Sequence, residues 1–169
     1  MNKSWIANGF TAANALFGGL SIMMSISGEY HVAAICILIA MAADAFDGRV
    51  ARALGTAGPM GVELDSLSDD ISFGVAAGAL MYSYQLRELG ALGFIPCALL
   101  GAFCAFRLAR FNVKVTSVHG YFEGLPCPTV GVIIACYVLS GVKIWNWLAM
   151  VCVLALAVLM VSEVHYPDN

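Results

Sequence analysis

The stretch ADAFDGRVARALGTAGPMGVELDSLSDD, which runs from Ala43 to Asp70, concentrates carboxylates in an otherwise apolar sequence. Asp44 and Asp47 are three residues apart, and this spacing places both on one face of a helix. Asp65 and Asp69 are four residues apart and share a face of a following helix in the same way. The stretch therefore predicts two helices that each present a pair of acids.

The segment from Gly55 to Pro59 separates these helices, because glycine and proline mark turns. We expect the helices to fold back antiparallel, so that the two pairs of carboxylates face each other at similar depth. Four carboxylates do not all stay ionised side by side without cations. Divalent cations such as Mg²⁺ or Mn²⁺ prefer oxygen ligands, and two metals suit phosphoryl transfer. The spacing alone leaves a second interpretation open, in which the acids pair with Arg49 and Arg52 or line an ion path.

The composition indicates a membrane protein. Of 169 residues, 61% are hydrophobic and 11% are charged, whereas a soluble domain carries about 25% charged residues. A soluble chain this apolar would expose large apolar patches and aggregate. The formal net charge of −3 and the lack of a basic run give no indication of a nucleic-acid partner. At this length we expect one domain, a transmembrane catalytic domain over residues 1–169.

Six segments are apolar enough to be spanning helices, which need roughly 20 mostly apolar residues. Glycine-containing or charged segments separate them, as at Ser27 to Glu29 and Gly141 to Lys143. The six cysteines include no CxxC pair, and we expect them to act as small hydrophobic residues. The expected fold is an all-α integral membrane protein with helices at residues 8–27, 31–53, 61–86, 89–111, 126–142 and 145–163.

Lysine and arginine predict the orientation, because cytoplasmic loops carry an excess of them. With six spans, both termini lie on one side of the membrane. Two basic residues, Arg87 and Lys143, fall on the other side, against six on the side of the termini. We therefore expect the termini and the acidic helix ends of a multi-pass cell-membrane protein to face the cytoplasm. The six basic residues are Lys3, Arg49, Arg52, Arg107, Arg110 and Lys114.

Small residues beside the acids leave room for a ligand. Gly48 and Ala51 let a substrate or another backbone approach the first acidic helix, and Gly61 does so on the second. Arg52 lies five residues beyond Asp47 and carries a fork of donors that suits a diphosphate. These residues predict a groove with metals at one end and a phosphate-binding cation nearby.

The fixed positions follow the pattern Asp-x2-Asp-Gly-x2-Ala-Arg-x8-Gly-x3-Asp-x3-Asp. This pattern resembles the signature of the CDP-alcohol phosphatidyltransferase family, and every fixed position is present at its spacing. The resemblance implies a six-helix membrane fold, a homodimer and two divalent cations, Mg²⁺ or Mn²⁺. It implies that Asp44, Asp47, Asp65 and Asp69 are the metal ligands. It also implies that Asp69 is the general base that deprotonates the attacking hydroxyl.

The same resemblance implies a site for the cytidine diphosphate of a CDP-lipid. The segment Asn8-x2-Thr11-x2-Asn14 resembles the opening of bacterial and archaeal phosphatidylserine synthases, with Ala7 where that group usually has proline. Asn8 and Thr11 could contact the nucleotide, or Asn8 could cap its helix. The expected nucleotide contacts are Asn8, Thr11, Gly48, Ala51, Arg52, Gly58 and Gly61.

Three later segments also resemble this serine-accepting group. They are Glu63 to Gly74, Phe106 to Asn112, and Phe122 to Pro128, the last with Cys127 where Ser or Ile is more usual. A serine substrate needs a cation for its carboxylate, which Arg107 or Arg110 could supply. These arginines could instead anchor the chain to anionic headgroups. Asn112 could hold the serine amine or order the loop. The expected acceptor contacts are Arg107, Arg110 and Asn112.

The resemblance implies transfer of the phosphatidyl group of CDP-diacylglycerol, or a related CDP-lipid, to L-serine, giving phosphatidylserine and CMP. Another acceptor, such as glycerol 3-phosphate or inositol phosphate, or an archaeal ether-lipid donor, stays open. A divalent-cation transporter also stays open. However, the acids collect at one face and the last two helices carry almost no charge, whereas a transporter needs polar groups along a full path.

Overall fold

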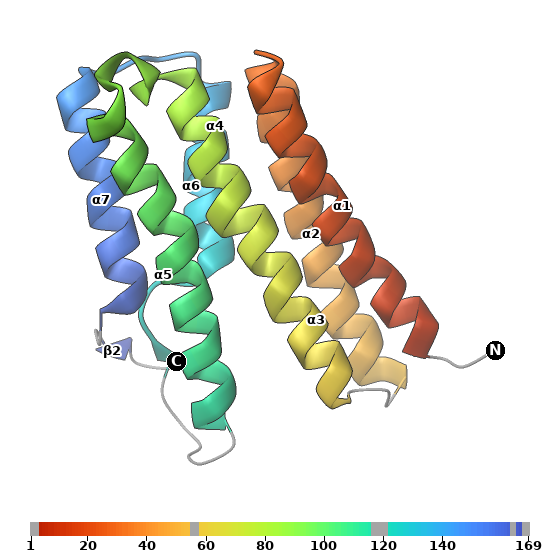
Figure 1. Cartoon of the computed structure of the whole chain (residues 1–169). Coiled ribbons are helices and arrows are strands. Elements are labelled where there is room, and N and C mark those ends of the chain that lie inside the picture. The colour runs from red at the N-terminus through yellow and green to blue at the C-terminus, as the bar shows by residue number, and fades with distance from the viewer. Residues whose placement is uncertain (1–3, 55–57, 116–121, 163–164, 167–169) are drawn as a thin grey trace.

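The structure, a computed structural model, describes residues 4–54, 58–115, 122–162 and 165–166. Over these residues the chain folds into six helical rods that run side by side (Figure 1), as the sequence predicted. The first two rods, α1 (Ser4–Ile26) and α2 (Tyr30–Leu54), are joined through Gly28, whose φ of +84° suits glycine. The others are built from α3 (Pro59–Asp69), α4 (Ala76–Tyr84), α5 (Ala91–Val115), α6 (Cys127–Leu139) and α7 (Asn146–Val161).

The third rod consists of α3 and α4, joined by a π-helical segment from Asp70 to Val75. The backbone stays helical at both junctions, with φ and ψ of −63° and −41° at Asp69 and −67° and −40° at Ala76. One helix was expected over residues 61–86, and the rod agrees with that expectation. The π-helical segment was not predicted, because it leaves the apolar pattern of the sequence unchanged. It begins directly after Asp69, and such segments are frequent at functional sites.

Three helical segments are long and apolar enough to cross a membrane, Asn8–Ile26, Tyr30–Val50 and Ala91–Val113. Helices α6 and α7 are apolar but shorter, and the π-helical segment divides the third rod. Large apolar side chains point outward along α1, where Ile26 is 73% exposed and Met23 is 61% exposed. Such a surface is stable against lipid rather than against water. The protein is therefore a membrane protein.

Glycines let the rods approach each other closely. A Cβ atom at Gly78 of α4 would lie 2.4 Å from the carbonyl oxygen of Cys97 in α5. A Cβ atom at Gly131 of α6 would lie 2.7 Å from the ring of Phe73, which is fully buried. Small residues at such contacts are the usual means of packing helices within a membrane. The third rod is in contact with α1, α5 and α6.

Different contacts link the segments at the two ends of the bundle. At the end of α4, the side chain of Gln85 donates hydrogen bonds to the Ile144 carbonyl at 2.6 Å and to Asn146 at 3.1 Å. At the other end, the two-residue strands β1 (Phe122–Glu123) and β2 (His165–Tyr166) pair antiparallel. The sequence did not predict this pair. It joins the segment before α6 to the segment after α7.

Candidate active site

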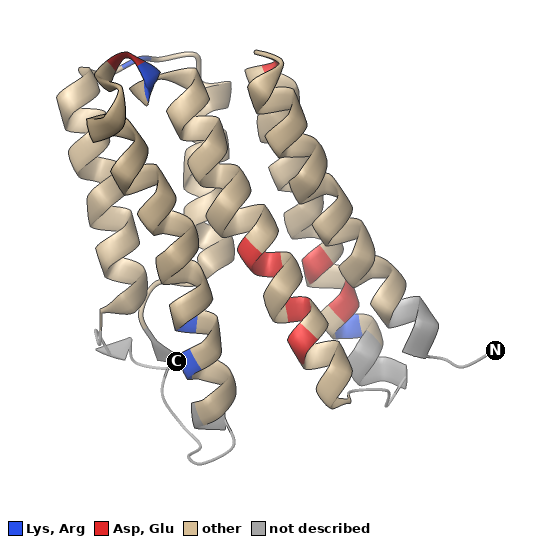
Figure 2. Ribbon diagram, in the orientation of Figure 1, with Lys and Arg blue, Asp and Glu red and all other residues tan. Residues whose placement is uncertain are grey.

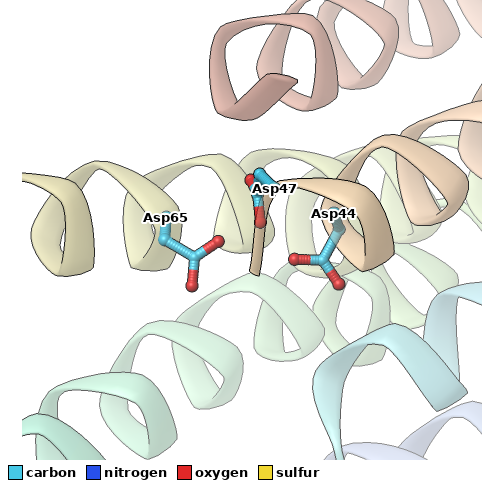
Figure 3. A group of neighbouring side chains, drawn as sticks. All are labelled: Asp44, Asp47 and Asp65. Atoms are coloured by element: carbon cyan, nitrogen blue, oxygen red, sulfur yellow. The ribbon is translucent and has the colours of Figure 1, made fainter. Parts of the chain in front are cut away.

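Most of the acidic residues gather on α2 and on the third rod, in the half of the bundle that contains α3 (Figure 2). Asp44, Asp47 and Asp65 form the tightest group, since one carboxylate oxygen from each lies within 4.8 Å of the others. The carboxyl groups of Asp44 and Asp65 point toward one another from α2 and α3, with Asp47 between them (Figure 3). Asp47 is only 5% exposed. The antiparallel return of α3 along α2 therefore brings acids of the two helices together.

The oxygens of this group suit a divalent cation. Asp47 Oδ2 and Asp65 Oδ1 are buried and have no hydrogen-bond partner in the described part of the chain. An unpaired buried carboxylate oxygen is costly, and a hard cation bound to it removes that cost. Three carboxylates at this separation also repel one another unless positive charge is supplied. The donor set, oxygen only and negatively charged, is the one that divalent cations such as Mg²⁺ and Mn²⁺ prefer.

Asp69 lies beside this group rather than within it. Its carboxyl group is in hydrogen-bonding contact with Asp44, and Asp44 contacts Asp65 in the same way. On its other side, Asn14 Nδ2 of α1 donates a hydrogen bond of 3.0 Å to Asp69 Oδ1. Asp69 is 8% exposed and Asn14 is fully buried. Asp69 therefore connects the acidic group to α1.

The next residue, Asp70, faces another part of the bundle. Its carboxyl group contacts the thiol of Cys104 in α5. The difference follows from helix geometry, because successive residues point about 100° apart. Asp70 is therefore turned away from the acidic group although it adjoins Asp69 in the sequence.

Some of the residues expected to hold the nucleotide lie next to one another or next to the acidic group. A Cβ atom at Gly61 would lie 3.9 Å from Asn8 Oδ1, so the N-terminal parts of α1 and α3 are neighbours. Thr11 is buried, and its hydroxyl is in hydrogen-bonding contact with Asp47. Gly48 is half-buried within α2.

Gly58 precedes α3 in an extended conformation, with φ of −132° and ψ of 161°. It is followed by Pro59 in the first turn, a position where proline's missing N–H costs no hydrogen bond. The side chains of Ala51 and Arg52 lie outside the described residues. The expected contact of Arg52 with a diphosphate therefore remains a prediction.

The residues expected to hold the acceptor come from α5. Arg107 Nη1 donates to the sulfur of Cys127 at 3.6 Å, and Arg107 Nε is buried without a partner among the described residues. Asn112 Nδ2 donates a 3.0 Å hydrogen bond to Ser66 of α3. Arg110 is half-buried on the same helix. The structure thus brings Arg107 to the start of α6, and Asn112 to the helix that carries Asp65.

Two residues of this site had no assigned role in the sequence analysis. Asn14 was noted as the third position of the Asn8-x2-Thr11-x2-Asn14 segment, yet it is the residue that contacts Asp69. Ser72 donates a 2.9 Å hydrogen bond to the backbone carbonyl of Asn14. The three-residue spacing of Asn8, Thr11 and Asn14 was the available signal, because it puts all three along one side of α1.

Comparisons with known proteins agree with this geometry. The sequence model of the CDP-alcohol phosphatidyltransferase family matches residues 4–161. A Helicobacter pylori relative named CDP-diacylglycerol–serine O-phosphatidyltransferase is 36% identical over 168 residues, which cover 95% of this chain and 71% of the relative. A Bacillus subtilis relative of the same name is 35% identical over 158 residues, covering 93% of this chain and 86% of the relative.

An archaeal relative extends the comparison. The archaetidylserine synthase of Methanothermobacter thermautotrophicus is 38% identical over 156 residues, which cover 91% of this chain and 66% of the relative. With the helical membrane fold and the group of three aspartates, these matches define the class of protein. The chain belongs to the CDP-alcohol phosphatidyltransferase family, and it is an enzyme of that family.

Proposed function

We propose that this protein transfers the phosphatidyl group of CDP-diacylglycerol, or of a related CDP-lipid, to the hydroxyl of L-serine, giving phosphatidylserine and CMP. The observation that carries the proposal is the group of Asp44, Asp47 and Asp65, with Asp69 beside it, in a chain of this family. The names of the Helicobacter and Bacillus relatives support serine as the acceptor. The name of the archaeal relative supports a serine lipid as the product.

Two divalent cations, Mg²⁺ or Mn²⁺, complete the proposed site. Asp44, Asp47, Asp65 and Asp69 would hold them, and the unpaired oxygens of Asp47 and Asp65 support this assignment. When bound, the cations neutralise negative charge that develops on the diphosphate during the reaction. Thr11, whose hydroxyl contacts Asp47, would keep that carboxylate in place.

Asp69 is the proposed general base. It takes the proton of the serine hydroxyl, and the serine oxygen forms a bond to the phosphorus that carries the lipid. The bond from that phosphorus to the bridging diphosphate oxygen breaks, and CMP leaves with the electron pair. The burial of Asp69 supports this role, because a general base works best where water does not compete for the proton.

The nucleotide would lie beside the N-terminal parts of α1 and α3 and the C-terminal end of α2. The closeness of Asn8 to Gly61 supports this position, and Gly48 and Gly58 would let the ribose and phosphates approach the backbone. Ala51 and Arg52 complete the set from the last turn of α2. Arg52 would hold the diphosphate with two parallel hydrogen bonds.

The acceptor would approach from the side of α5. Arg107 is proposed to bind the serine carboxylate, and its buried unpaired Nε supports this choice over Arg110. Arg110 would assist at the lipid phosphate. Asn112 already donates to Ser66, so we propose that it holds α5 against α3 and contacts serine at most indirectly.

The proposal also includes the orientation of the protein in the membrane and its oligomeric state. We infer that residues 1–169 act as one six-helix domain of the cell membrane, with both termini and the active site facing the cytoplasm. We also infer a homodimer. Alanines 98, 102, 105 and 109 are exposed on α5, and a face of small residues lets the helix of a second copy approach closely.

Incorporation of labelled serine into lipid tests the proposed function. The purified full chain would be placed in micelles with CDP-diacylglycerol, Mn²⁺ and ¹⁴C-serine, and label would be counted in the chloroform-soluble fraction. Label appearing with the mobility of phosphatidylserine supports the proposal. If instead liposomes holding the protein pass Mn²⁺ without CDP-lipid, while no label enters lipid, a transport function replaces it.

A further inference from the structure

Asn14 of α1 is a polar residue at a buried position, where an apolar side chain would be the ordinary choice. It is fully buried, and its Oδ1 atom has no hydrogen-bond partner in the described part of the chain. Leaving a buried acceptor unpaired destabilises the folded protein, and an apolar side chain at this position would avoid that cost. The bond that Asn14 does make is therefore the feature to explain, and it is a bond to Asp69.

The direction of that bond is fixed by chemistry. A carboxylate that binds a metal ion is ionised and only accepts hydrogen bonds, whereas an amide offers both a donor and an acceptor. Asn14 must therefore present Nδ2 to Asp69 Oδ1, as it does at 3.0 Å, and its own Oδ1 is turned away from that carboxylate. One oxygen of Asp69 is held in this way. The carboxyl group of Asp69 also contacts Asp44, so its plane is fixed from two sides.

Asn14 is itself anchored to the third rod. Its backbone carbonyl accepts a 2.9 Å hydrogen bond from the Oγ atom of Ser72, which lies three residues beyond Asp69. A Cβ atom at Gly18, one turn along α1, would lie 2.3 Å from Ser72 Oγ and 2.9 Å from its Cα atom, so α1 and the π-helical segment are in direct contact there. The amide of Asn14 is thus presented to Asp69 from a helix that cannot shift without losing this contact.

We propose that Asn14 is a positioning residue, which orients the Asp69 carboxylate toward the metal ions and the acceptor. This inference rests on the proposed function for its catalytic consequence, but its effect on metal binding does not depend on which acceptor is used. Hydrogen-bond partners of metal ligands typically change metal affinity or activity by about 10- to 100-fold when they are removed. Asn14→Leu removes the donor and also the unpaired acceptor, and it keeps the branching of the side chain although its two methyl groups are bulkier than the amide.

The test measures Mn²⁺ binding to the full chain in detergent by electron paramagnetic resonance. It compares the unchanged protein with Asn14→Leu, Asp69→Ala and the double variant. We expect Asn14→Leu to raise the Kd for Mn²⁺ by about tenfold. In the Asp69→Ala background the same change is expected to alter Kd by less than about twofold, because the two residues act as one unit. Ser25→Ala is the matched control, since Ser25 is a buried polar residue of the same helix whose hydroxyl donates to the Ser21 carbonyl and not to the third rod, and its Kd is expected to stay within about twofold.

A purely structural role predicts a different pattern. Asn14→Leu removes one buried unpaired acceptor but leaves Asp69 Oδ1 without its donor, so some loss of melting temperature is expected, whereas a purely structural role predicts no change in metal affinity while the protein stays folded. Asn14→Ala provides a second variant if leucine does not fit. An unchanged Kd in folded Asn14→Leu and Asn14→Ala, or an equal loss with and without Asp69, overturns the proposal.

Steady-state kinetics distinguish a failure of this inference from a failure of the proposed function. With serine as acceptor, Asn14→Leu is expected to lower kcat by about 10- to 100-fold, with the KM for serine changed by less than about threefold. If the unchanged protein transfers nothing to serine, the proposed function fails, and the Mn²⁺ measurements still decide the role of Asn14.

Discussion

Asn112 Nδ2 of α5 donates a hydrogen bond of 3.0 Å to Ser66 Oγ of α3, the residue that directly follows Asp65. The bond ties the helix that carries Arg107 to the helix that carries the acids. Residues separated by more than 40 positions in the sequence are thereby fixed in one site. This contact supports the proposal that Arg107 and the acids act on one substrate.

Arg107→Gln is expected to raise the KM for serine by about 10- to 100-fold, because a hydrogen bond to a charged group is worth roughly 1.5–3 kcal/mol. The change in kcat should be smaller, since the carboxylate is bound in both the ground state and the transition state. Initial rates at varied serine concentration measure both constants. Arg87→Gln is the control, because Arg87 is exposed beyond the far end of α4. An equal effect of both variants would rule out a specific role for Arg107.

Asp69→Asn is expected to lower kcat by roughly 10²- to 10⁴-fold, the usual contribution of a general base, while the protein stays folded. Asparagine keeps the shape of the side chain but cannot take the proton. Asp70→Asn is the matched control, because its carboxyl group faces Cys104 instead of the acidic group. Single-turnover rates for the two variants give the comparison. Substantial activity in Asp69→Asn would exclude its role as base.

Mn²⁺ is expected to stabilise the folded protein. A ligand that binds only the folded state at 100 times its Kd adds about 2.7 kcal/mol, which raises the melting temperature. Asp65→Asn should remove much of this shift, because Asp65 belongs to the group of three. Glu29→Gln, a change in the exposed turn before α2, should keep it. Thermal unfolding in detergent with Mn²⁺ or with chelator measures the shift, and equal curves for the unchanged protein in both would speak against a metal site.

Gly78→Ala is expected to destabilise the bundle by about 1–3 kcal/mol, since the added methyl group would meet the Cys97 carbonyl at 2.4 Å and force α4 away from α5. Gly19→Ala is the matched control within a helix, because a Cβ atom at Gly19 meets nothing within 4 Å. Alanine also favours the helix over glycine, so Gly19→Ala should be neutral or slightly stabilising. Thermal unfolding measures the stability of both variants. Equal melting temperatures would show that α4 and α5 do not pack closely at Gly78.

The helices were predictable because the membrane imposes their length and composition. The six apolar segments correspond to the six rods, and positive φ at Gly28 and Gly141 marks two of the predicted breaks. The ends were less predictable. Helix α5 continues to Val115 instead of residue 111, and α6 ends at Leu139 instead of residue 142. Hydropathy does not register the last turn of a helix, where polar and apolar residues are equally acceptable.

The acidic group was predictable for a related reason. Spacings of three and four residues fix which acids share a helix face, and the glycine and proline residues between the two helices predicted that these helices fold back on each other. Spacing does not reveal contacts across helices that are distant in the sequence. The bond from Asn14 to Asp69 spans 55 positions, and that from Asn112 to Ser66 spans 46. Only the packing of α1 and α5 against the third rod creates them.

The most direct test of the central claim is CMP release by the purified full chain with CDP-diacylglycerol and Mn²⁺, with and without L-serine. We expect CMP release that depends on serine, stops with chelator and returns with added Mn²⁺ or Mg²⁺. Folded protein that releases CMP with glycerol 3-phosphate or inositol phosphate but not with serine would contradict the proposed acceptor. Release that continues in full after removal of all divalent metal would contradict the proposed site.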